Sequence, residues 1–156
     1  MKRIFTVMTF AVLFSALASA QDYNNAIGLR GGLYNGITFK HFLSGKAAFE
    51  LLGATRWSGI EVTGLYELHS NAFDVDRLNW YFGFGAHVGF YNGDNNTYDD
   101  PAGSYMVLGA DGILGIEYNF TELPVNISLD WKPAFNFIGY SRFWGDGGAL
   151  SIRYYW

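Results

Sequence analysis

Histidine and serine stand side by side at residues 69 and 70, and this pair is the first candidate for chemistry in the chain. A serine hydroxyl becomes a nucleophile when a histidine accepts its proton and a third group orients that histidine. The stretch HSNA, from His69 to Ala72, places no acidic side chain convincingly beside the pair. The competing interpretation is a polar strand end that enters a turn, and we favour it.

The three histidines are scattered, and the chain has no cysteine, so the sequence contains no metal-ligand spacing. His87 lies in LNWYFGFGAHVGFY, where small and polar residues alternate with apolar ones. A proton-handling or ligand role for His87 is open, but a hydrogen-bonded interior histidine is the favoured interpretation. We expect no metal and no cofactor.

Two stretches near the predicted loops carry candidate contact residues. NGDNNTYDDPAGS concentrates Asp94, Asp99 and Asp100, and such oxygens suit hard cations, but the spacing is not that of an EF-hand. A solvated loop is therefore favoured. FWGDGG carries Trp144, which is either a surface contact or an aromatic side chain at a membrane interface.

The elements that would position these residues are strands, because apolar residues recur with period two along the chain. Turn-forming residues separate eight such segments, and the short connections favour antiparallel hairpins. The pattern is weakest in the second and third segments, where Phe42 and Leu52 break the alternation. The expected strands are residues 25–33, 37–42, 48–52, 60–68, 78–91, 105–120, 125–137 and 149–156.

Eight strands close a barrel that its own side chains can fill. A soluble lipocalin-like barrel would have the apolar face inside, and a membrane barrel would have it outside. Trp80, Phe84 and Trp131 are among many bulky apolar residues that one small lumen could not hold, whereas glycines gather on the opposite face. We therefore expect an all-β fold, an eight-stranded antiparallel up-and-down transmembrane β-barrel.

Charged residues then fall on the lumen face near the inner strand ends. Arg30, Lys40 and Arg153 would form a positive wall opposite acidic residues, and buried charges must be paired. We predict ion pairs across the lumen; separate charges solvated by lumen water are the alternative. This charge layer comprises Arg30, Lys40, Glu50, Glu67, Glu117, Asp130 and Arg153, and His87, Asp111 and Lys132 are further polar lumen residues.

The first twenty residues have the pattern of a secretory signal. Lys2 and Arg3 precede an apolar run too short to span a membrane, and Ala18-Ser19-Ala20 fits a cleavage site. We expect residues 1–20 to be a cleaved signal peptide and residues 21–156 to be one barrel domain. Without cysteine, that domain has neither a disulfide nor a lipid-anchored cysteine.

The composition is unusual for a soluble protein. Aromatic residues make up 19% of the chain and charged residues only 15%, against about 25% charged in typical soluble domains. Beyond Lys2 and Arg3 the chain is acidic and has no basic run to follow phosphates. Nucleic acid is therefore not an expected partner.

The chain ends in ALSIRYYW, with Leu150, Ile152, Tyr154 and Trp156 at alternating positions. This ending is similar to the C-terminal assembly signal of bacterial outer-membrane barrels. With GLYELH, LNWYFGFGAHVG, ISLDWKPAFN and WGDGGALSIRY, the mature chain resembles the small OmpA/OmpX-like barrels and the Bacteroidota outer-membrane β-barrel-domain proteins. The resemblance implies an integral protein in the outer membrane of a Gram-negative cell envelope, contact with outer-membrane lipid, and delivery by periplasmic chaperones to the barrel-assembly machinery.

That fold hosts many activities, so the resemblance implies no shared function. We expect a non-enzymatic envelope structural protein or a surface-interaction protein that acts through its outer loops. A lipid-modifying enzyme and a small, porin-like pore are the alternatives. The outer-membrane lipid A deacylases have the pattern His-x-Ser-Asn, from which the adjacent His69 and Ser70 depart.

Overall fold

The computed structural model describes residues 23–56, 59–91, 105–139 and 142–156, and this part of the chain is all β. The predicted signal peptide and Asp94, Asp99 and Asp100 lie outside the described residues. The strands are β1 (Asn25–Gly32), β2 (Asn35–Phe42), β3 (Ala47–Arg56), β4 (Gly59–Asn71), β5 (Leu78–Tyr91), β6 (Tyr105–Asn119), β7 (Val125–Trp131), β8 (Ala134–Ile138), β9 (Arg142–Trp144) and β10 (Gly148–Tyr155).

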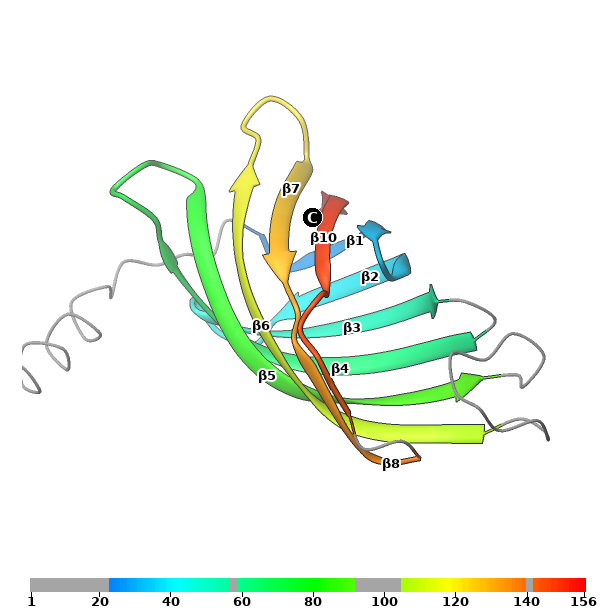
Figure 1. Ribbon diagram of the computed structural model, residues 1–156. Coiled ribbons are helices and arrows are strands. Elements are labelled where there is room, and N and C mark those ends of the chain that lie inside the picture. The colour runs from blue at the N-terminus through cyan, green and yellow to red at the C-terminus, as the bar shows by residue number, and fades with distance from the viewer. Residues whose placement is uncertain (1–22, 57–58, 92–104, 140–141) are drawn as a thin grey trace, which may run out of the picture.

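Successive strands from β1 to β7 pair antiparallel, and β8 pairs with β6 and β9. β10 pairs with both β7 and β1, so the sheet closes on itself (Figure 1). β7 and β8 are two halves of one barrel strand, interrupted at Lys132 and Pro133, because proline has no N–H for the ladder. β9 and β10 are likewise two halves of the last strand. The result is a closed, eight-stranded, up-and-down antiparallel barrel, which confirms the predicted architecture.

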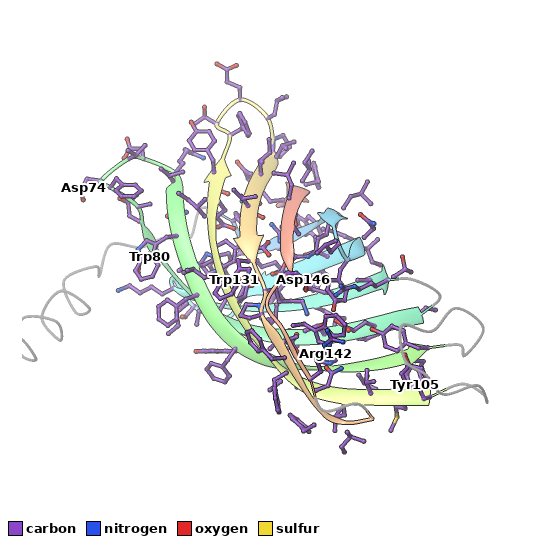
Figure 2. All side chains as sticks on the ribbon, in the orientation of Figure 1. Asp74, Trp80, Tyr105, Trp131, Arg142 and Asp146 are labelled. Carbon is purple, nitrogen blue, oxygen red and sulfur yellow. The ribbon has the colours of Figure 1, made fainter. Side chains whose placement is uncertain are left out.

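The two ends of the barrel differ and are named here for use below. The base carries the β2–β3, β4–β5 and β6–β7 turns and the C-terminal Trp156, and the rim is the opposite end. Figure 2 shows Asp74, in the β4–β5 turn, at the base and Tyr105, at the start of β6, at the rim. Within the described part of the chain, no helix has the length and apolar character needed to cross a membrane.

The strands present two chemically different faces. On β5, Tyr81 and His87 are buried, whereas Phe84 is 69% exposed, so the small and polar face of this strand points into the barrel. A Cβ atom at Gly115 would lie 2.5 Å from the Tyr81 ring, so this inward glycine leaves room for an aromatic neighbour, as expected. The apolar face is the outer surface of the barrel.

Two expectations from the sequence were wrong in detail. Residues 139–147 were expected to form one loop, but β9 lies within them and pairs with β8. Phe42 and Leu52 keep the alternation after all, because both side chains are buried and point into the barrel. Both are apolar side chains on the lumen face, so the rule that apolar residues face outward assigned them to the wrong face.

Candidate functional site: the charge-lined lumen

All seven residues of the charge layer are buried on the inner side of the barrel wall. Arg30 on β1 reaches past β10 to Asp130 on β7, where its two terminal nitrogens donate to the two carboxylate oxygens at 2.6 and 2.5 Å. A bidentate guanidinium–carboxylate pair combines charge attraction with fixed geometry. The Tyr81 hydroxyl donates a further hydrogen bond to Asp130 at 3.2 Å.

Lys40 on β2 lies among three carboxylates of this layer. Its ammonium is 2.9 Å from Glu67 on β4 and 3.4 Å from Glu117 on β6. Glu50, on the neighbouring strand β3, is more distant at 3.9 Å. Lys40 therefore joins opposite walls of the barrel, as an ion pair across the lumen requires.

Arg153 on β10 is surrounded by hydrogen-bond acceptors. One terminal nitrogen donates to Glu50 at 2.5 Å, and the other donates to Ser128 at 2.6 Å and to Asn126 at 3.2 Å. Its Nε donates to the Thr38 hydroxyl at 3.1 Å. A buried guanidinium with every nitrogen bonded in this way is fully compensated for the loss of water.

His69 belongs to this network, although the sequence analysis assigned it to a strand end near a turn. Its side chain is buried, with Nε2 3.1 Å from Glu67 and Nδ1 3.3 Å from Glu117. Its ring stacks on Tyr81 at 4.9 Å between centroids. The signal was present in the sequence, because His69 has the same parity on β4 as Glu67.

Apolar groups close the lumen on both sides of the charge layer. Toward the base, Tyr23, Ala26, Phe42 and Ala48 form a buried cluster, with the Tyr155 ring stacked on Tyr23. On the rim side, a second buried cluster joins the three aliphatic side chains next to Tyr81: Leu52, Leu65 and Ile113. The charge layer therefore lies between two buried apolar clusters.

A second polar group, the outer cluster, lies nearer the rim and comprises Glu61, His87, Asp111, Lys132 and Asn136. The Lys132 ammonium is 2.6 Å from Asp111 and 3.3 Å from Glu61. His87 lies between two acceptors, with Nδ1 2.7 Å from Asp111 and Nε2 2.8 Å from Asn136. Three of the five residues, His87, Asp111 and Lys132, were predicted to be polar lumen residues.

Glu61, His87 and Asp111 are a donor set that could hold a metal ion. One ligand atom of each lies within 4.8 Å of the others, and imidazole and carboxylate ligands together suit several divalent metals. The Lys132 ammonium, however, already lies between the two carboxylates and offsets one of their two negative charges. A metal ion would have to displace this internal cation, so the lysine competes with any metal for the site.

Arg56, at the rim end of β3, crosses the lumen mouth. It donates to Asp146 at 3.0 Å and to the Tyr34 hydroxyl at 2.7 Å, and it lies over the Trp144 ring at 4.8 Å. Burial, with Glu61 nearby, raises the pKa of Tyr34, in the β1–β2 turn, to about 12, so its phenol stays neutral. Trp144 was expected in a loop, but it lies on β9, which pairs with β8 as a hairpin.

The remaining predicted residues separate by face. His69 points into the barrel, and Ser70, the next residue on β4, belongs to the opposite parity. The two side chains therefore do not form a nucleophile and base pair. The predicted assembly-signal residues point outward and are half exposed: Leu150, Ile152, Tyr154 and Trp156.

No protein-family model matches this chain, and the search of curated proteins found no match. The geometry described above therefore carries the functional argument.

Proposed function

We propose that the chain is an integral outer-membrane β-barrel whose lumen is closed by paired charges. One observation carries the proposal: the outward-facing positions of the described strands hold no Asp, Glu, Lys or Arg. Arg142, at the start of β9, is exposed but lies opposite Asn136 in the β8–β9 ladder. Because the Asn136 side chain points inward, Arg142 belongs to the inward face as well. A barrel in water has no reason to keep charge off the outward face of its strands, whereas a barrel in lipid must.

Aromatic side chains on the outer surface support the same placement. Trp80, Tyr118 and Tyr154 lie near the base ends of their strands, on the outward face, and Trp156 stacks near Tyr154 at 5.9 Å. Aromatic belts of this kind lie at the level of the lipid headgroups, where one side of the ring is apolar and the other is hydrated. The base would then lie at the periplasmic interface.

The direct test is cell fractionation followed by gel electrophoresis with and without boiling. We expect the protein in the outer-membrane fraction, and we expect unboiled protein to migrate differently from boiled protein because a closed barrel resists detergent unfolding. Recovery in the soluble periplasm with identical mobility in both lanes would overturn the membrane proposal.

A small pore is the rival function in transport, and it predicts ion flow. The packed lumen supports the opposite expectation, because the charge layer lies between two apolar clusters. We expect purified protein in a planar lipid bilayer to show no steady open-channel conductance. A stable conductance that scales with salt concentration would contradict the closed lumen.

The role that we propose is envelope structure or surface interaction, with no catalytic step. It rests on a lumen whose buried charged side chains form ion pairs with one another and on the separation of His69 and Ser70 to opposite faces of β4. Membership among the small OmpA/OmpX-like barrels is part of this proposal and is supported by the strand number and connectivity. A lipid-modifying activity would require hydrolysis of outer-membrane lipid by the purified barrel, and we expect none.

A further inference from the structure

The charge layer does not balance with its arginines and lysine alone. Among the described residues it contains three cations, Arg30, Lys40 and Arg153, and four carboxylates. The carboxylates are Glu50, Glu67, Glu117 and Asp130. Because these side chains are buried, bulk counterions do not contact them to offset the remaining negative charge. The layer is neutral only if it takes up one proton.

His69 is the group placed to hold that proton. Nε2 lies 3.1 Å from a Glu67 oxygen, and Nδ1 lies 3.3 Å from a Glu117 oxygen. A neutral imidazole has one N–H and one lone pair, so one of its nitrogens would direct a lone pair at a carboxylate. An imidazolium has two N–H groups and no lone pair, so its positive charge attracts both carboxylates. Nε2 is hydrogen-bonded to Glu67, whereas Nδ1 contacts Glu117 as an ion pair without hydrogen-bond geometry.

We propose that the charge layer binds one proton and that His69 holds it as an imidazolium bridging Glu67 and Glu117. His69 then acts as the fourth cation of the layer. This proton-binding site rests on the burial and geometry of the layer and does not depend on the membrane placement.

The other groups around the ring do not replace this cation. Lys40 on β2 interacts with the same two glutamates and shares the Glu67 Oε2 atom with His69, and its charge is already included in the balance. The Tyr81 ring on β5 stacks on the His69 ring at 4.9 Å between centroids, and the Phe42 ring on β2 lies tilted against it at 4.8 Å. The Tyr23 hydroxyl approaches Glu117 at 3.3 Å as a neutral donor.

The principal rival site for the proton is a carboxylate pair. Glu50 and Glu67 interact with each other, and a proton shared between them would also balance the layer. The two sites differ in observable terms, because one gives a histidine ring with two N–H groups and the other gives a neutral histidine and a protonated carboxyl.

Nuclear magnetic resonance of the folded wild-type protein with 15N-labelled histidine distinguishes them. The variants His41→Gln and His87→Gln assign the signals of those residues, so the His69 signal follows without changing the charge layer. We expect both His69 ring nitrogens to carry protons at neutral pH and above. A neutral His69 ring at pH 7 would overturn the proposal, whether or not a carboxyl is protonated instead.

Stability as a function of pH gives an independent measurement. An unfolded histidine releases its proton near pH 6.5, so above that pH the folded state would hold one proton more than the unfolded chain. The folding equilibrium constant should then fall by about tenfold for each pH unit, until the layer itself loses the proton. The stabilisation is complete below about pH 6.5 and is lost as the pH rises.

His69→Gln should lower by one the number of protons that the folded state holds in excess of the unfolded chain, so the tenfold change per pH unit should disappear. His41→Gln, at the exposed base end of β2, should leave the pH dependence unchanged. His69→Gln also leaves one negative charge unbalanced, so adding Glu67→Gln should restore part of the lost stability. Equal pH dependence in wild type and His69→Gln would refute the proposal. If His69→Gln fails to fold, the wild-type resonance measurement still decides.

Discussion

Replacing Arg30 with alanine should lower the free energy of unfolding by about 3–5 kcal/mol, the usual cost of removing one partner from a buried ion pair. Asp130 would remain buried with only the Tyr81 hydroxyl as a donor, since both of its oxygens are otherwise bonded to Arg30. The measurement is denaturant unfolding of the refolded barrel, followed by tryptophan fluorescence and by migration on an unboiled gel.

A double-mutant cycle separates the ion pair from the loss of side-chain packing. Adding Asp130→Asn to Arg30→Ala removes the uncompensated charge, so the double variant should be more stable than Arg30→Ala alone. The matched control is Arg142→Ala at the exposed rim end of β9, where the loss should stay below about 1 kcal/mol. If the Arg30 and Arg142 variants lost the same stability, the charge layer would be hydrated and its pairs would contribute little.

The fold could be predicted from the sequence because a strand repeats every two residues and a barrel has only two faces. Once His87 and Glu117 were assigned to one parity and Phe84 and Leu114 to the other, each strand had a single consistent orientation. The same rule assigned all seven residues of the charge layer to the interior. The odd or even position of a residue along its strand decides whether its side chain points inward or outward, whichever residue it contacts.

The partners themselves could not be predicted, because they depend on the stagger between strands. Arg30 and Lys40 were expected on one wall opposite Glu67 and Glu117, with Glu50 and Asp130 at the sides. In the structure, Arg30 binds Asp130 and Arg153 binds Glu50, while only Lys40 reaches the two opposite glutamates. A shift of two residues in register changes every such pair and leaves the parity pattern intact.

The residues that sequence reasoning missed share a physical reason. His69 and Glu61 have the inward parity of β4, but one was interpreted through its serine neighbour and the other lies next to a turn. Residues 139–147 were expected to form a loop, although β9 lies within them and pairs with β8 as a hairpin. In each case nearby turn-forming residues outweighed an alternation that continues along the strand.

Replacing Phe84 with arginine should lower the free energy of unfolding in lipid vesicles by about 2–4 kcal/mol, the cost measured for a charge on the lipid face near mid-membrane. Phe84 lies at the middle of β5, points outward and is 69% exposed on the barrel surface. An arginine there would face hydrocarbon, with no acidic residue on the outward positions of the described strands to pair with it.

The informative control is the same charge on the same face near the rim. Thr55→Arg, close to the rim end of β3, would lie near the headgroups and should cost at most about 1 kcal/mol. The neighbouring inward Gly85 is unsuitable as a control, because an added Cβ would collide with the Gly64 carbonyl oxygen.

The dependence of the stability loss on depth distinguishes a lipid environment from water. In a barrel surrounded by water, arginine at position 84 and arginine at position 55 would both be solvated. Equal and small losses at the two positions would therefore refute the membrane placement, whereas a loss confined to Phe84 would support it.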